Sequence, residues 1–552
     1  MIRSDVDVLV IGSGIGGLCA AGLCARAGRE VLVLEAHHQP GGAAHGFQRQ
    51  GYHFESGPSL WSGLGRWPSS NPLAQVLRAL GQTVEVIPYR SWDVLLPEGD
   101  LRIAVGHDDF EAVVRSLRGP EVAAEWRRFV EALQPIAAAA DALPLLALRP
   151  GVDGMAQLLK RGGRLLPHLA AMRHLSGSFG PLVDRHLSDP FLRHWVDLLS
   201  FLISGMPMGD TNAAAMATLF GEWFEPDAHL DYPVGGSAAV VEALVRGLKA
   251  HGGSLHTGKA VQQLRVEGDR VVGVTLADGT QIAARQVICN ADIWSTLALL
   301  PESVAPKWQR QRQATPACNG FLHLHLGFDA TGLEDLPIHT VWVDDWERGI
   351  DAERNAVVLS IPSVLDPSMA PAGRHVLHAY TPASEPWELW ADLERDSAAY
   401  QQRKQERCAV FWRVLERRIP DIRDRCELIM EGTPLTHSHF LNVHQGSYGP
   451  ALSAAEGLFP GVTTPLANFW LCGASTFPAI GIPPVAASGA MAAHAVLGRE
   501  TQNSLLRELE LSISCVITSF WNADAVHDFQ RPDRFAAADA HGSAHAQRAD
   551  PS

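Results

Sequence analysis

The apolar positions divide the start of the chain into two short runs separated by glycines. Val6–Ile11 is short and rich in β-branched residues, which predicts a buried parallel strand. Leu18–Ala27 is rich in Ala and Leu and predicts a helix, which Gly28 is placed to end. Glu30–Ala36 is a second apolar run and predicts another strand. This order of strand, turn, helix and strand is typical of a nucleotide-binding α/β unit.

The turn after the first strand has the spacing G-x-G-x-x-G, at Gly12, Gly14 and Gly17. The first glycine allows the tight turn, the second lets the backbone approach a pyrophosphate, and the third lets the helix pack on the strand. Glu35 ends the second strand, where an acid can accept hydrogen bonds from ribose hydroxyls and argues against a 2′-phosphate. We therefore expect a dinucleotide, and the pair Gly41-Gly42 favours FAD over NAD because it adds a second close backbone approach.

Beyond this unit the pattern becomes helical and then returns to strands. Phe110–Phe224 is rich in Leu and Ala at helical spacing, which predicts a helical insertion. Ser254–Asn290 alternates with two turns and predicts a strand, a hairpin and a final buried strand. Pro484–Gly498 predicts an Ala-rich helix whose N-terminus is available to an anionic or electron-rich ligand. Short strands are also expected at residues 321–327, 357–361, 375–380 and 470–472, a charged helix at 397–419, and disorder after about residue 531.

Length, charge and cysteine usage exclude several classes of protein. The chain has 552 residues, enough for two or more domains, and its net charge of −15 argues against nucleic acid as the main partner. No run of about 18 apolar residues predicts a membrane span, and the early first strand leaves no room for a signal peptide. Eight scattered cysteines without C-x-x-C indicate neither a zinc nor a dithiol motif and favour the cytoplasm.

One segment reverses the acidic balance of the chain. Gly154–Gly177 contains Lys160, Arg161, Arg164 and Arg173 but no acid. It is either the solvated basic face of a core helix or an amphipathic segment that rests on an anionic bilayer. On a bilayer, each basic residue near the surface contributes roughly 1 kcal/mol. Both interpretations stay open, and the second predicts peripheral membrane contact through residues 154–177.

Two histidines alternate along the expected strand Phe321–Gly327. His323 and His325 share one face, as metal ligands do, but no matching acid lies nearby in the sequence. We interpret them as the polar face of a strand and predict no metal site.

Four stretches together resemble the FAD-dependent group of phytoene desaturases, carotenoid cis-trans isomerases and retinol saturases, within the amine-oxidase-like flavoproteins. They are Val10–Gly42, Tyr232–Ser237, Gly432–Gly449 and Cys472–Gly489. The first is shared by the whole superfamily. The last two are more specific and resemble the carotenoid isomerase and retinol saturase branch.

The resemblance implies FAD bound in an extended form. It assigns the adenosine and pyrophosphate to Gly12, Gly14, Gly17, Glu35, Gly41 and Gly42. It places the adenine at the backbone of Val261, and the flavin ring over Gly473, Gly481, Pro484 and Val485. One residue departs from the family, which usually has Gly-Asp where this chain has Gly473-Ala474. The missing acid normally bonds the ribityl or pyrophosphate region, so its loss is expected to weaken FAD binding by about 1.5–3 kcal/mol.

The pattern and the resemblance together predict an α/β fold, in which a Rossmann-like FAD-binding domain is interleaved with a mixed α+β substrate domain carrying a helical insertion. The FAD-binding domain is expected at 1–109, 230–300 and 432–500, the helical substrate or membrane-facing domain at 110–229, the substrate sheet at 301–431, and a partly disordered extension at 501–552.

The implied activity is that of an FAD-dependent oxidoreductase that desaturates, saturates or isomerises the C=C bonds of a carotenoid or retinoid. Two alternatives stay open: an amine-oxidase-like flavoenzyme, and a non-catalytic prenyl- or lipid-binding escort on the same fold. Aromatic residues that are candidates to line the substrate cleft are Trp61, Phe220, Trp223, Phe440 and Phe477. No catalytic base is assigned; the possible ones are Glu222, Glu225, His437, His439 and His444.

Overall fold

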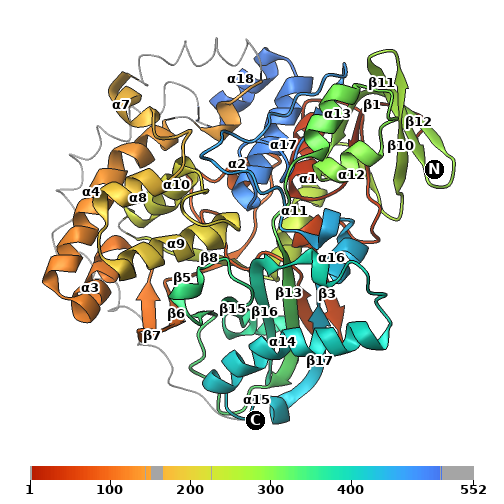
Figure 1. The fold of residues 1–552 in the computed structure, drawn as a ribbon. Helices are drawn as coiled ribbons and strands as arrows, with labels where there is room; N and C mark the ends of the chain where they lie inside the picture. The colour runs from red at the N-terminus through yellow and green to blue at the C-terminus, as the bar shows by residue number, and fades with distance from the viewer. Residues whose placement is uncertain (1–2, 143, 151–165, 226, 510, 512–552) are drawn as a thin grey trace, which may run out of the picture.

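A computed structural model describes residues 3–142, 144–150, 166–225, 227–509 and 511. The described chain contains two seven-stranded sheets and a helical layer (Figure 1). The first sheet has the order β10-β11-β12-β1-β2-β9, and β18 also pairs with β12. Its strands are β1 (Asp5–Ile11), β2 (Val31–Leu34), β9 (Ser254–His256), β10 (Val261–Glu267), β11 (Arg270–Leu276), β12 (Gln281–Cys289) and β18 (Phe469–Leu471).

The first sheet is buried on both faces because β2 is apolar throughout and the C-terminal halves of β1 and β12 carry apolar residues on both sides. Val8 and Val10 of β1 face one core, while Leu9 and Ile11 face the other. β1 pairs in parallel with β12 and β2, as the early strand–helix–strand pattern predicts. One face is covered by α1 (Ile15–Arg26), α2 (Pro72–Ala79), α11 (Gly236–Ala250) and α17 (Ile482–Val496), and the other packs against α12 (Ile293–Ala298) and the more polar α13 (Pro306–Gln313).

The second sheet has the order β17-β13-β16-β15-β14-β6-β7. Its strands are β6 (Ser91–Leu96), β7 (Gly99–Ala104), β13 (Gly320–Asp329), β14 (His339–Val343), β15 (Ala356–Ser360), β16 (Arg374–Glu385) and β17 (Cys426–Gly432). Leu322, Leu324 and Leu326 face a core shared with α14 (Ala398–Arg418). The intervening His323 and His325 therefore face the opposite side, towards the hairpin of β3 (Gly46–Arg49) and β4 (Tyr52–Glu55) and towards α16 (Pro434–Leu441).

The helical layer packs around large aromatic side chains. It comprises α3 (His107–Arg118), α4 (Pro120–Asp141), α8 (Gly180–His186), α9 (Pro190–Ser204) and α10 (Ala213–Trp223). By length and composition Pro120–Ala147 could cross a membrane, but α4 places Trp126, Phe129 and Leu133 in the helical core. The remaining elements are α7 (Leu169–Met172), α15 (Ile422–Arg425), α18 (Arg499–Glu508), and the antiparallel pair β5 (Val86–Tyr89) and β8 (Leu230–Pro233).

The structure confirms the predicted α/β class and differs from the sequence predictions in two details. The first helix begins at Ile15 rather than Leu18, because Gly14 is already its N-cap. Strands β6 and β7 pair within the second sheet, where β6 runs parallel to β14. This pairing groups residues 91–104 with the second sheet, although the expected boundary lay at residue 109. Residues 154–165 of the basic segment and the tail after residue 511 lie outside the described residues.

Two glycines let α1 and α17 cross at backbone contact (Figure 1). A Cβ atom added to Gly489 would overlap the carbonyl oxygen of Gly16. A Cβ added to Gly16 would lie 2.9 Å from the carbonyl oxygen of Val485. The distance between the two helices is therefore fixed by the absence of side chains at the crossing.

We expect Gly489→Ala to lower the free energy of unfolding by about 1–3 kcal/mol, because the added methyl group overpacks the crossing. Urea unfolding followed by circular dichroism measures the change. The control is Gly461→Ala, since an added Cβ there meets no atom within 4 Å. Equal unfolding midpoints for the two variants would contradict this account of the crossing.

Candidate functional site

The glycine turn has the geometry that its spacing predicts. Gly12 has φ +88° and donates its N–H to the carbonyl of Leu34 at 2.8 Å. A Cβ on Gly17 would overlap the carbonyl oxygen of Gly12, and a Cβ on Gly14 would lie 2.6 Å from Nδ2 of Asn290. Gly14 is also the N-cap of α1 and offers no side chain to its first amides. These amides are therefore free of a side-chain cap at the position where such folds bind phosphate.

The second glycine pair lies against this turn. Gly41 has φ +118° and Gly42 has φ +57°, so both adopt backbone conformations that favour glycine. Gly41 forms a β-bridge with Gly14, and its N–H donates to the carbonyl of Ser13 at 2.9 Å. The structure thus brings together the two glycine motifs that the sequence placed on one cofactor.

Glu35 braces the turn from the end of β2. Its Oε2 accepts hydrogen bonds from the backbone N–H and the hydroxyl of Ser13, at 2.8 and 2.7 Å. Its Oε1 accepts the N–H of His37 at 2.8 Å. The N–H of Lys259 donates to the Glu35 carbonyl at 2.8 Å, which brings the start of β10, with Val261, beside the acid. The residues expected at the adenosine end are therefore neighbours.

The expected flavin end approaches the same turn from the C-terminal part of the chain. Gly473 has φ +94° and donates its N–H to the Ser488 hydroxyl at 2.8 Å. Gly481 has φ +110° and is the N-cap of α17, whose first turn contains Val485. Because the Val485 carbonyl lies against Gly16, the N-termini of α1 and α17 converge.

Asn290 lies at the point of convergence, and sequence reasoning missed it. Its N–H donates to the carbonyl of Ile11 at 2.8 Å, directly after β12. A Cβ added to Gly473 would lie 2.9 Å from its Oδ1, so the amide touches both glycine segments. Its position was a usable signal, because a polar residue that follows a buried parallel strand lies at the edge where such sheets bind ligands.

Ala474 is partly exposed and presents only a methyl group to this region. The segment around it is held by other groups: Ser475 Oγ accepts the N–H of Ile293 at 3.0 Å, and Thr476 Oγ1 donates to the Gly473 carbonyl at 2.9 Å. The backbone around position 474 is therefore anchored by its neighbours and does not depend on an acid at this position.

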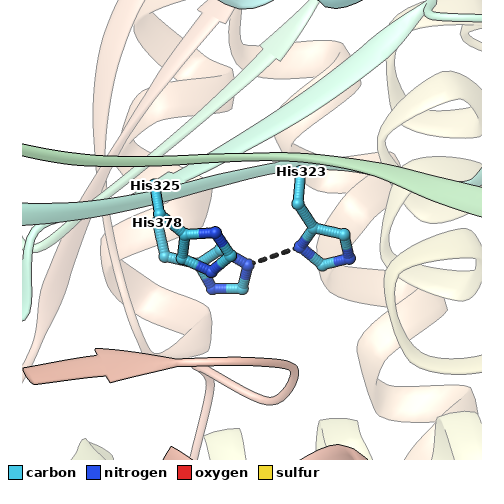
Figure 2. Close-up of side chains that lie close together, drawn as sticks. All are labelled: His323, His325 and His378. Atoms are coloured by element: carbon cyan, nitrogen blue, oxygen red, sulfur yellow. Dashed lines mark hydrogen bonds between the residues drawn. The ribbon is translucent and has the colours of Figure 1, made fainter. Parts of the chain in front are cut away.

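Seven rings lie on or beside the face of the second sheet that points towards the β3–β4 hairpin, and we call this set the ring wall. It consists of Phe321, His323, His325, His378, Tyr380, His437 and Tyr448. His323 Nδ1 and His378 Nε2 lie 2.7 Å apart and share a hydrogen bond (Figure 2). His325 Nε2 donates to the carbonyl of Glu55 at 3.0 Å, and the hydroxyls of Tyr380 and Ser59 lie 3.2 Å apart. These bonds join the second sheet to the segment that follows the Gly41-Gly42 pair.

Burial controls the protonation of the ring wall. It lowers the pKa of His323 and His378 well below the usual value, and lowers the pKa of His325 and of His437 to about 4. All four imidazoles are therefore neutral at pH 7. Burial also raises the pKa of Glu55 to about 7, against the opposing hydrogen bond that its carboxylate accepts from the N–H of Ser237 at 2.9 Å.

The structure scatters most of the aromatic and acid–base candidates. Phe220 and Trp223 belong to the helical core, Trp61 and Phe477 to the core of the first sheet, and Phe440 is 42% exposed. His437 alone among the five possible bases belongs to the ring wall. Glu222 and Glu225 lie at the end of α10, His439 is exposed, and His444 stacks on Trp294.

The site residues fit FAD. The N-termini of α1 and α17, which have no side-chain caps, converge on one glycine turn. Glu35 lies beside that turn, where an acid can bond a ribose. The ring wall faces the β3–β4 hairpin, which follows the second glycine pair in the chain. When bound, FAD supplies the redox chemistry, while the protein binds and orients it.

Comparison with known proteins identifies the family of the chain. Residues 15–497 match the family described as flavin containing amine oxidoreductase. The chain is 32% identical to prolycopene isomerase of Arabidopsis thaliana, over 91% of this chain and 85% of that protein. It is 26% identical to the lycopene-forming phytoene desaturase of Pseudescherichia vulneris, over 87% of this chain and 96% of that protein.

A solved structure shows the same fold. Putrescine oxidase bound to putrescine superposes with a TM-score of 0.60 at 17% identity, covering 89% of this chain and 98% of that one. The glycine turn, the acid of β2, the converging helices and the match over residues 15–497 lead to one conclusion: the chain belongs to the flavin-containing amine oxidoreductase family and is an FAD-dependent oxidoreductase.

Proposed function

We propose that this protein uses FAD to act on the C=C bonds of a hydrophobic isoprenoid, a carotenoid or retinoid, and that cis-to-trans isomerisation is its main reaction. The carrying observation is the 32% identity to a prolycopene isomerase along nearly the whole chain, against 26% to a phytoene desaturase. The ring wall supports a polyene, because none of its side chains is charged at neutral pH and a hydrocarbon needs no charged partner.

The residues of the chain divide the work between cofactor and substrate. The amides of the α1 turn and the acid Glu35 would hold the nucleotide half of FAD, and Gly473 with the start of α17 would lie near its flavin ring. The ring wall provides flat, neutral surfaces that exclude water from an apolar chain. The hydrogen bond from His325 to the Glu55 carbonyl holds the ring wall against the β3–β4 hairpin.

The two alternatives receive less support. The likeness to putrescine oxidase is a likeness of fold, and it brings no amine specificity to this chain. A lipid-binding escort without cofactor has no need for the positive-φ glycines Gly12, Gly41 and Gly473, which the chain retains. An absorption spectrum of the purified protein separates the enzyme from the escort, because bound flavin is coloured.

We also propose that the protein is cytoplasmic and contacts a membrane peripherally, as a hydrophobic substrate requires. Leu166 is 65% exposed and Leu169 is 57% exposed, and both lie in the basic segment with Arg173. Exposed leucines beside basic residues favour the bilayer interpretation of this segment over a solvated face.

With reduced FAD, we expect the purified protein to convert a poly-cis carotenoid to the all-trans isomer without net consumption of the reductant. Chromatography and the absorption spectrum of the product measure the conversion. The matched control is the same reaction with oxidised FAD. Turnover of amines but of no polyene would overturn the proposal, and a product with more double bonds would instead indicate a desaturase.

We expect Ala474→Asp to tighten FAD binding by roughly 10- to 150-fold, because a charge-assisted hydrogen bond to the cofactor contributes about 1.5–3 kcal/mol. Titration of the apoprotein by flavin fluorescence measures the dissociation constant. Ala474→Ser is the control, since it adds a hydroxyl but no charge. An unchanged constant in the Asp variant would show that another group, such as Asn290, already fills this position.

On vesicles that contain anionic lipid, we expect the double variant Leu166→Glu, Leu169→Glu to bind about 10-fold more weakly or worse. Inserting one leucine contributes about 1.5–3 kcal/mol. Co-sedimentation measures the bound fraction. The control is Leu458→Glu, because Leu458 is 51% exposed but lies outside the basic segment. Equal binding by the double variant and the control would contradict membrane contact through this segment.

A further inference from the structure

Two neighbouring strands place three imidazoles on one face of the second sheet. His323 and His325 are two positions apart on β13, so their side chains point to the same side. His378 of β16 is the direct antiparallel partner of His325. One nitrogen from each ring lies within 4.8 Å of the others, and Figure 2 shows the rings hanging together beneath the two strands.

The surroundings leave ligand positions available on these rings. His325 donates Nε2–H to the Glu55 carbonyl, which fixes the tautomer that carries its lone pair on Nδ1. A backbone carbonyl that orients the other nitrogen in this way is the usual partner of a metal-binding imidazole. His323 Nδ1 and His378 Nε2 face each other, and the outer nitrogens of the same two rings, His323 Nε2 and His378 Nδ1, have no hydrogen-bond partner among the described residues, so each ring is held through its nitrogens only by the other. Each of the three residues is at most 8% exposed, so water reaches none of them freely.

We propose that His323, His325 and His378 form a binding site for a divalent first-row transition-metal ion of the class of Zn²⁺. A set of imidazoles without carboxylates suits Zn²⁺ and its neighbours, whereas Mg²⁺ and Ca²⁺ prefer oxygen ligands. Three protein ligands leave a fourth position open. His437 of α16 is the nearest further imidazole, with its ring centroid 4.6 Å from that of His323.

Coordination requires a small rearrangement of the rings. His323 Nδ1 and His378 Nε2 are 2.7 Å apart, closer than two nitrogens that each lie about 2.0–2.1 Å from one tetrahedral ion. The three rings are also parallel within 6°. The ion therefore replaces the shared hydrogen bond, and His323 and His378 turn about their Cβ–Cγ bonds towards Nδ1 of His325, whose own orientation the Glu55 carbonyl fixes. The backbone positions need no change, because the strands already set the spacing.

The site lies between the second sheet and the β3–β4 hairpin, because the carbonyl that orients His325 belongs to Glu55, the last residue of β4. A bound ion would tie the second sheet to this hairpin through His325. The three histidines also belong to the ring wall, but the test of the metal site uses no substrate, so its outcome is separate from that of the isoprenoid reaction.

The test uses the full chain produced without a polyhistidine tag, stripped with a chelator, equilibrated with Zn²⁺ and desalted. Elemental analysis is expected to find about one ion per chain, as for a single three-ligand site. His378→Ala and His325→Ala are each expected to weaken Zn²⁺ binding by about 100-fold or more, beyond the effect of losing a supporting partner. The control is His375→Ala, because His375 lies on the same strand, is half-buried and bonds Ser363 Oγ at 2.9 Å.

Failure to retain Zn²⁺ in the wild type would overturn the proposal and leave a proton-sharing pair at His323 and His378. The proposal would also be overturned if His378→Ala and His325→Ala both retained as much Zn²⁺ as the control His375→Ala. Should the variants fail to fold, the wild type decides alone. Its thermal midpoint must then rise with the concentration of free Zn²⁺, as binding to the folded state requires, and a constant midpoint contradicts the site.

Discussion

Backbone contact between α1 and α17 is the constraint on which the site depends. Gly16 and Gly489 let the two helices cross with no side chain between them, and this crossing brings the Val485 carbonyl against the glycine turn. The two helix N-termini can therefore serve one cofactor although they belong to opposite ends of the chain. Any larger residue at the crossing would separate the nucleotide end of the site from the flavin end.

The second sheet depends on a different constraint: successive side chains along a strand point to opposite faces of the sheet. Leu322, Leu324 and Leu326 supply a hydrophobic core with α14, and this leaves alternate positions of β13 free for other chemistry. His323 and His325 occupy those positions, facing the FAD-binding part. One strand thus provides stability on one face and a functional surface on the other.

The sequence reveals the parts of the site that are determined locally. Residue type and spacing within a short stretch are enough to indicate the turn at Gly12, the acid Glu35 and the pair Gly41-Gly42, because each meets a local steric or charge requirement. Asn290 was missed although its position directly after a buried strand was a usable signal, whereas His378 could not be placed in this way, because its role depends on pairing with a distant strand. The pairing of β6 with β14 was missed for the same reason, since register between remote strands leaves no trace in either strand alone.

The composition of the ring wall argues that it does more than exclude water. Leaving a buried polar atom without a partner costs about 1–3 kcal/mol, and among the described residues His323 Nε2 and His378 Nδ1 have none. Leucine or phenylalanine would line an apolar cleft without that cost, and the other face of β13 shows that leucines fit this strand. Retaining imidazoles here is therefore a net loss of stability unless their nitrogens bind something. An ion bound between His323 Nδ1 and His378 Nε2 offsets this loss, because two metal–ligand bonds then replace one shared hydrogen bond.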